Sequence, residues 1–175
     1  MTLARAVDPS GATSEDRALY RRASGELAKG VAVISAVHGG RDHASTIIDY
    51  LSVSYDPPTM VASLYGLSRI AEAVEEAGEW ALSVLAADQR WIADRLGSQG
   101  APLIALLDQI PHHRREEGAP ALIDGALAHF ELRSMAMHAA ATHALVVGEV
   151  TWMEMPSAGA GRPLIRYRSG YGGMN

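Results

Sequence analysis

The chain has 175 residues, of which 48% are hydrophobic, and its formal net charge is −5 at pH 7. A single domain is expected at this length, and about 70% of the surface of the unfolded chain can be buried in it. The acidic balance argues against a nucleic-acid partner, and the absence of cysteine excludes disulfides, thiolate metal ligands and thiol nucleophiles.

The sequence gives no indication of a membrane partner or of secretion. No apolar run approaches the ~20 residues that a membrane-spanning helix needs. The N-terminus has no apolar region typical of a signal peptide, so a cytoplasmic protein is expected. Residues 1–13, small and polar without a period, are predicted to be a flexible arm, residues 14–171 one domain, and residues 172–175 a short tail.

The first predicted helix begins directly after the arm. Ser14 is expected to cap it, because a serine side chain can accept a hydrogen bond from the first turn. Apolar residues recur every four positions from Leu19 to Leu27 and predict a buried stripe. Gly30 is expected to end the helix in a left-handed conformation.

Seven strands are predicted from β-branched, aromatic and apolar residues bounded by turn signals. They are residues 31–37, 43–54, 60–65, 80–85, 126–137, 142–153 and 163–168. Glycines at 39–40, prolines at 57–58 and alanines at 139–141 mark turns, and residues 170–175 read as a loose tail. Because no βα alternation of the kind that a parallel sheet requires is present, an antiparallel barrel is expected.

Two short helices are predicted between these strands. The first spans residues 69–77, with Ser68 as its cap and Gly78 at its end. The second spans residues 88–96, with Asp88 as its cap. Residues 97–119 show the least regular pattern, and their polar centre is expected to face solvent.

Several short motifs occur along the chain in a particular order, and together they resemble the flavin reductase family over roughly residues 15–171. The motifs are Gly30-Val31-Ala32-Val33-Ile34, the stretch from Ala44 through Ser52-Val53-Ser54 to Asp56-Pro57-Pro58, Ser68-Arg69-Ile70, Arg95-Leu96-Gly97-Ser98, Thr142-His143, and Tyr167-Arg168-Ser169-Gly170-Tyr171. The resemblance implies a mainly β fold, an antiparallel Greek-key split β-barrel of the FMN-binding type with a few short flanking helices.

The resemblance also implies an activity. Members of this family use NADH or NADPH to reduce FMN or FAD, and often supply the reduced flavin to a partner monooxygenase. The flavin carries the redox chemistry, while the protein mainly binds and orients both rings. A homodimer with the cofactor near the subunit interface is implied as well.

The resemblance implies which residues lie around the flavin and the nicotinamide. His143 would be a catalytic residue on the nicotinamide side. The expected cofactor-binding residues are Thr46, Ile47, Ile48, Asp49, Tyr50, Leu51, Val53, Ser54, Ser68, Arg69, Ile70, Arg166, Tyr167, Arg168, Ser169 and Tyr171. No metal site is predicted, because the adjacent histidines 112 and 113 diverge on any regular element and lack a third ligand at a useful spacing.

Three positions depart from the family pattern and leave alternatives open. Ile48 replaces an amide side chain, Asp49 replaces a serine, and Ile70 replaces a hydroxyl residue. A carboxylate buried in the apolar segment around Asp49 would be a candidate acid or base. One alternative is therefore a diverged split-barrel enzyme of a biosynthetic pathway that no longer uses flavin in the usual way, with Asp49 as a catalytic residue. Another is a non-catalytic protein that binds flavin or haem.

Overall fold

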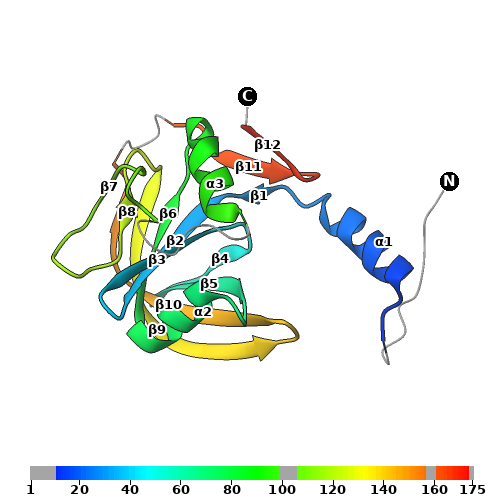
Figure 1. Cartoon of the computed structure of the whole chain (residues 1–175), viewed down its shortest axis with the longest axis horizontal. Coiled ribbons are helices and arrows are strands. Elements are labelled where there is room, and N and C mark those ends of the chain that lie inside the picture. Colours follow the sequence, from blue (N-terminus) through cyan, green and yellow to red (C-terminus); the bar gives the residue numbers. More distant parts are fainter. Residues whose placement is uncertain (1–10, 99–105, 157–160, 174–175) are drawn as a thin grey trace.

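The computed structural model describes residues 11–98, 106–156 and 161–173 (Figure 1). Most of the predicted arm (residues 1–10), residues 99–105 of the irregular segment and residues 174–175 of the tail lie outside the described residues. In the described part, long antiparallel strands dominate and helices are few, as the sequence predicted.

Seven strands form one sheet in which every hydrogen-bonded pair is antiparallel. In spatial order they are β3 (Arg41–Ile47), β2 (Ala32–His38), β6 (Glu79–Val84), β9 (Ala128–Ala140), β10 (His143–Glu154), β5 (Pro58–Tyr65) and β4 (Tyr50–Tyr55).

Two smaller sheets and three α-helices complete the described chain. The sheets are β1 (Lys29–Gly30) with β11 (Leu164–Tyr167) and β12 (Gly170–Gly173), and β7 (His112–His113) with β8 (Leu122–Ile123). The helices are α1 (Ser14–Ser24), α2 (Arg69–Ala77) and α3 (Arg90–Gly97), the last preceded by a 3-10 turn, η1 (Ala87–Gln89).

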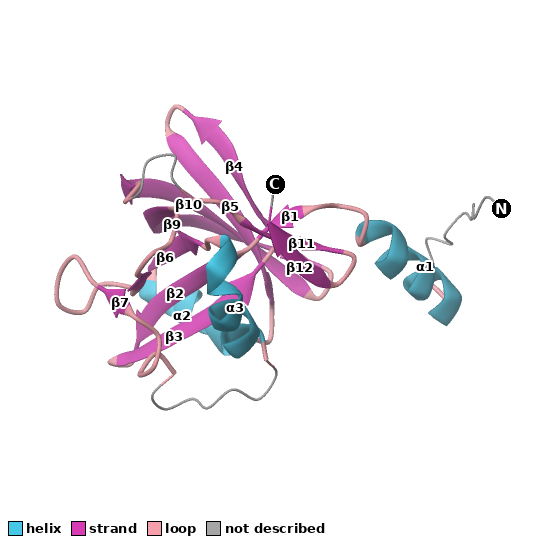
Figure 2. Cartoon of the chain, turned by 90° about the horizontal axis from the view of Figure 1, so that it is seen from above, coloured by secondary structure: helices cyan, strands magenta, loops and turns pink. Residues whose placement is uncertain are grey.

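The order of the strands requires the large sheet to curl back on itself. β3 and β4 are its two edges, yet only Ile48 and Asp49 link them along the chain. Such a link spans about 10 Å at most, so the two edges meet at this point. Beyond it they diverge, with β4 extending away from β3 in Figure 2. The result is a barrel that is split along one side.

The single strand predicted over residues 43–54 is therefore wrong. The segment is two strands, because β3 pairs with β2 while β4 pairs with β5. The apolar and β-branched residues run on without a break through Ile48, so the composition of the segment gave no signal of the crossover.

Two clusters of buried side chains fill the interior. Trp80 is fully buried in the first cluster, with α2 packed over it, and its indole Nε1 donates to Ser134 Oγ at 3.1 Å. Gly148 makes room for this ring, since a Cβ atom there would lie 2.7 Å from Trp80 Cζ2. The second cluster lies under α3 and includes Leu85, Ile92 and Leu164.

The first helix differs from its prediction at both ends. Thr13, not Ser14, is the N-cap, and it forms a capping box with Asp16. The helix stops at Ser24, and Gly30 lies in β1. The buried stripe is absent, because α1 lies apart from the sheet in Figures 1 and 2 and Leu27 is 61% exposed.

Other boundaries follow local hydrogen bonding. Ser68 and Gly78 bound α2 as predicted, but Asp88 lies inside η1 and α3 begins after Gln89. The turn before β10 falls at residues 141–142, one or two positions later than expected.

Two segments that the sequence assigned no regular structure contain short strands. The presumed loose tail contains β12, which pairs with β11 across a turn where Arg168 and Ser169 have φ values of 46° and 64°. The polar segment around His112 contains β7, which pairs with β8.

Among the described residues, no helix is both long enough and apolar enough to cross a membrane.

Candidate functional site

The crossover between β3 and β4 carries the first group of predicted cofactor residues. Thr46 Oγ1 donates to the carbonyl oxygen of Ala93 in α3 at 2.9 Å, so its side chain anchors that helix. Ile47 is buried in the first core cluster, and Ile48 is half-buried against the second. These three side chains hold the crossover in place, which leaves its backbone as the part that can contact a ligand.

Asp49 lies at the surface of the crossover. Its carboxylate forms an ion pair with Lys29, and its side chain is 53% exposed. Its backbone carbonyl accepts a hydrogen bond from the Ser63 amide at 2.8 Å. The apolar burial that would make Asp49 a candidate acid or base is therefore absent.

Tyr50 begins β4 with its ring turned inward against the first core cluster. Burial raises the pKa of its hydroxyl to about 12. Its oxygen approaches Gly30 closely, since a Cβ atom added there would lie 2.8 Å away. Tyr50 thus fixes the start of β4 against β1.

The outer side of β4 presents apolar side chains to solvent. Leu51, Val53 and Tyr55 are 56%, 55% and 93% exposed. Ser54 between them is engaged locally, with its hydroxyl donating to the Asp56 carbonyl at 3.1 Å. We call Leu51, Val53 and Tyr55 the β4 strip; it lies along an edge strand of the large sheet.

The start of α2 carries the next group. Ser68 accepts a hydrogen bond from the Ala71 amide at 3.3 Å as the helix cap. Ile70 is only 5% exposed and packs in the core. A hydroxyl residue at this position, as in the family pattern, would therefore point inward. Arg69 is exposed and lines a hollow that it shares with Arg41, His38, His43 and Glu72.

The C-terminal hairpin is tied to the segment after α1. Tyr167 Oη donates to Glu26 at 2.8 Å, and Arg168 contacts both carboxylate oxygens of Glu26, the closest at 2.9 Å. The hydrogen bonds from Arg168 and then Tyr167 lower the pKa of Glu26. Ser169 occupies the turn, and the Arg166 guanidinium lies 4.9 Å from the centre of the Tyr171 ring.

His143 stands at the exposed start of β10. Its ring meets Tyr65 edge-on at 5.9 Å, and its Nδ1 lies 3.0 Å from Thr142 Oγ1. In Figure 1 the hairpin between β9 and β10 is at the bottom, whereas β11 and β12 are at the top. One subunit therefore does not bring His143 together with residues 166–171.

Sequence reasoning missed two charged neighbours of these residues. Lys29 pairs with Asp49, and Glu26 holds the hairpin of Arg168. Both contacts bring together distant segments and leave no local pattern. Arg41 lines the same hollow as Arg69.

A scan against protein-family models matches residues 24–175 to the flavin reductase like domain. The chain is 30% identical to the NADH-dependent FMN reductase AsuE2 of Streptomyces nodosus subsp. asukaensis, over 94% of this chain and 88% of that protein. It is 34% identical to the FMN reductase (NADH) SmoA of Agrobacterium fabrum, over 81% and 77% of the two chains.

Solved structures agree with the sequence matches. The crystal structure of nitrilotriacetate monooxygenase component B from Mycobacterium thermoresistibile superimposes with a TM-score of 0.85 at 27% identity, covering 93% of this chain and 88% of that one. The chain belongs to the flavin reductase-like family. The family that the motifs indicated and the antiparallel split-barrel fold are both confirmed.

The residues present fit a flavin mononucleotide in two respects. The β4 strip offers exposed apolar surface of the kind that packs on a planar ring. The hollow at Arg69 offers guanidinium donors of the kind that bind phosphate. The buried side chains of Ile47 and Ile70 do not oppose this fit, because they point away from the surface.

Proposed function

We propose that this protein is an NADH-dependent flavin reductase that supplies reduced FMN to a partner monooxygenase. The observation that carries the proposal is the exposed β4 strip beside the β3–β4 crossover, on a fold whose relatives include named NADH-dependent FMN reductases. A flavin held there would supply the redox chemistry, because its ring can accept hydride from the reduced nicotinamide.

Each part of the chain has a distinct task in this proposal. The crossover backbone at residues 47–50 binds the edge of the flavin ring, and Leu51 and Val53 cover its face and exclude water. Arg69 binds the phosphate. No described side chain near the crossover has to move a proton, which agrees with the exposed, ion-paired state of Asp49.

We further propose a homodimer. The candidate residues lie in separate places on one subunit, namely the crossover, the start of β10 and the C-terminal hairpin. The β4 strip and α1 leave large apolar side chains in solvent, including Leu51, Val53 and Tyr20, the last 74% exposed. A second copy of the chain would cover these side chains. The His143 side chain of that copy would approach the flavin ring.

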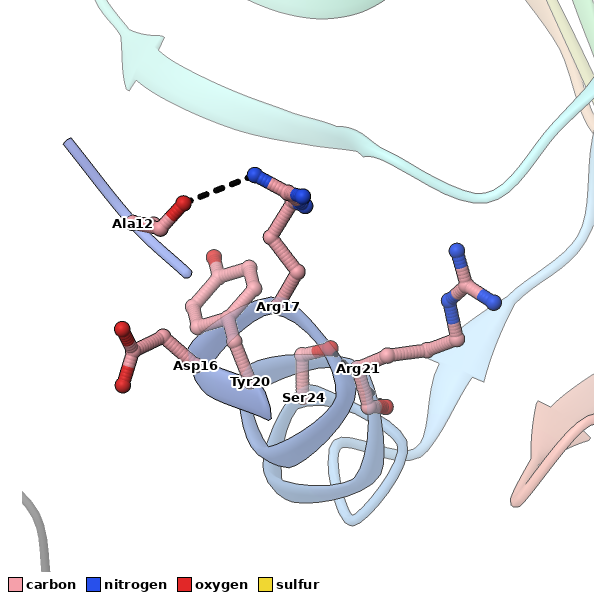
Figure 3. Close-up of a pocket in the computed structure, with 6 residues that line it drawn as sticks. All are labelled: Ala12, Asp16, Arg17, Tyr20, Arg21 and Ser24. Carbon is pink, nitrogen blue, oxygen red and sulfur yellow. Dashed lines mark hydrogen bonds between the residues drawn. The ribbon is translucent and has the colours of Figure 1, made fainter. Parts of the chain in front are cut away.

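Helix α1 supports this arrangement because its exposed surface carries a hollow. Among the described residues, those that line the hollow in Figure 3 run from Ala12 to Ser24, and Arg17 donates to the Ala12 carbonyl at 2.7 Å across it. Tyr20 stands beside Arg17 and is 74% exposed. We propose that this face rests on the partner subunit.

The relatives' names support the choice of cofactor and of recipient. AsuE2 and SmoA are named as NADH-dependent FMN reductases, so we propose NADH over NADPH and FMN over FAD. The third relative is component B of a monooxygenase, so we propose a monooxygenase as recipient. We also propose that the reaction takes place in the cytoplasm, because it needs a supply of NADH.

NADH oxidation by the purified protein tests the proposal. We expect turnover that requires added flavin, with kcat/KM higher for FMN than for FAD and higher for NADH than for NADPH. Flavin or haem binding without NADH oxidation would indicate a non-catalytic binding protein instead of a reductase. If neither flavin binds, the chain is a diverged enzyme and the proposal fails.

A further inference from the structure

Two histidines and a glutamate meet at the side of the molecule opposite α1. They are His113 in β7, His129 in β9 and Glu154 at the end of β10, and one ligand atom from each lies within 4.8 Å of the others. His129 and Glu154 are directly opposed in the β9–β10 pairing. In Figure 1 the β7–β8 sheet lies on the left, away from the C-terminal hairpin.

His129 is buried and lacks a hydrogen bond that it needs. His129 is 0% exposed, and its Nε2 atom has no hydrogen-bond partner among the described residues. A buried polar atom without a partner costs about 1–3 kcal/mol. A native fold rarely leaves such an atom unsatisfied, so a bound group at Nε2 would account for it.

The other ring nitrogen of each histidine is already held. His113 Nδ1 lies 2.6 Å from Asp124 Oδ1, and His129 Nδ1 lies 3.1 Å from Ser83 Oγ. The Ser83 oxygen is fixed in turn by the Ile123 amide, which donates to it at 3.0 Å. A supporting partner on Nδ1 is the usual arrangement around a metal-bound histidine, because it leaves the Nε2 lone pair for the ion.

The two rings also have an arrangement that leaves room for an ion between them. They meet edge-on, with centroids 5.6 Å apart and planes at 89°, so they do not stack.

We propose that His113, His129 and Glu154 bind one divalent transition-metal ion, Zn²⁺ in the first instance. Two imidazoles and one carboxylate suit zinc and leave a fourth position for water. Ligand atoms about 2.1 Å from a tetrahedral ion lie roughly 3.4 Å apart. The ligand atoms now lie within 4.8 Å of one another. His113 and Glu154 are both exposed, so their side chains have room to move to the shorter separation.

Such an ion would have a structural role. It would join β7, which belongs to the segment between α3 and β9, to the ends of two long strands of the main sheet. The proposal is independent of the reductase activity, because the three ligands lie outside the crossover, the β4 strip and the Arg69 hollow. The ligands come from positions far apart in sequence, so the spacing of histidines 112 and 113 gave no sign of them.

Zinc titration of the chelator-treated full-length protein, without flavin, tests the proposal. Zn²⁺ is titrated against a chromophoric chelator, and Co²⁺ is used to read coordination by visible absorbance. We expect one equivalent of Zn²⁺ per chain and a rise in melting temperature with Zn²⁺. Both His113→Gln and Glu154→Gln change exposed side chains, and each should weaken binding tenfold or more.

Matched variants separate this site from other histidines and acids. His138→Gln, at an exposed position on β9, and Glu117→Gln, at an exposed position outside the cluster, should bind Zn²⁺ like the wild type. Asp124→Asn should weaken binding by about 10- to 100-fold. Zinc affinity that is unchanged in both His113→Gln and Glu154→Gln, or a wild type that binds no zinc, overturns the proposal.

Discussion

The two edge strands of the large sheet differ in how far other elements of the chain cover them. Edge strand β3 contacts α2 and α3 and is mostly half-buried. Edge strand β4 is not packed to a similar extent by any described helix, and it exposes the β4 strip. An exposed apolar edge strand invites pairing with another chain, so natural proteins usually protect it. In the proposed homodimer, β3 is covered within the subunit and β4 is covered by the partner subunit.

The largest effect is expected from placing charge on the open edge. Leu51→Asp combined with Val53→Asp would bury unpaired carboxylates in the proposed dimer. Each such charge costs about 3–5 kcal/mol, so the dimer dissociation constant should rise by roughly 100-fold or more. Sedimentation analysis measures the dissociation, and flavin-dependent NADH oxidation should fall with it.

Met135→Asp is the control for this change, since Met135 is 58% exposed on β9, away from the β4 strip. We expect it to leave the dimer intact. A double variant on β4 that remains dimeric would show that this edge is not covered by a partner.

A second prediction concerns the closed interior rather than the edge. Gly148→Ala places a methyl group 2.7 Å from Trp80 Cζ2 and 3.1 Å from Leu132 Cβ. Overpacking of this kind costs about 1–3 kcal/mol of unfolding free energy, measured by denaturant unfolding. Gly172→Ala meets nothing within 4 Å and should be neutral. Equal stability of the two variants would contradict the close packing at Trp80.

The inner side of β4 should respond to alkaline pH. Because the pKa of Tyr50 is raised to about 12, its protonated form is favoured by folding over the unfolded chain, where tyrosine titrates near pH 10. Its contribution to stability is present below pH 10 and is lost as pH rises toward 12. Tyr50→Phe should flatten the decline of stability in this window. An unchanged slope would mean that another tyrosine dominates.

The hollow at Arg69 should distinguish FMN from riboflavin. Loss of one charged hydrogen bond to phosphate costs about 1.5 kcal/mol, so Arg69→Gln should raise KM for FMN about tenfold and leave KM for riboflavin unchanged. Arg133→Gln, at an exposed arginine on β9, should change neither. A parallel rise for both flavins would place the phosphate elsewhere.

The smallest effect is expected at Asp49. Its ion pair with Lys29 is partly exposed, and such pairs contribute about 0–1 kcal/mol. Asp49→Asn should therefore retain kcat within roughly twofold. Abolished turnover with unchanged flavin affinity would instead restore the acid–base alternative.

Local chemistry allowed much of the fold to be predicted. Ser68 and Gly78 gave the ends of α2, and alternating apolar residues gave β5, β6 and the β9–β10 pair, because these signals lie within a few residues of their effect. The crossover at Ile48 and the early end of α1 were missed. The crossover depends on which strand pairs with each half of the segment. The end of α1 reflects its packing, since Leu27 is exposed and covers no core surface.

The candidate site was predictable only as a set of segments. Motif order identified the crossover and the start of α2. The sequence could not show that Ile47 and Ile70 turn into the core, that Thr46 bonds to α3, or that Leu51 and Val53 are exposed. The pairs Lys29–Asp49 and Glu26–Arg168 join segments 20 and 142 residues apart. No local pattern encodes such contacts.

Anaerobic mixing of the wild-type protein and FMN with NADH tests the central claim most directly. The account predicts that the visible absorbance of oxidised FMN disappears in a single turnover, at a rate far above that of NADH and FMN alone. Flavin that binds to the protein but stays oxidised in the presence of excess NADH would contradict the account.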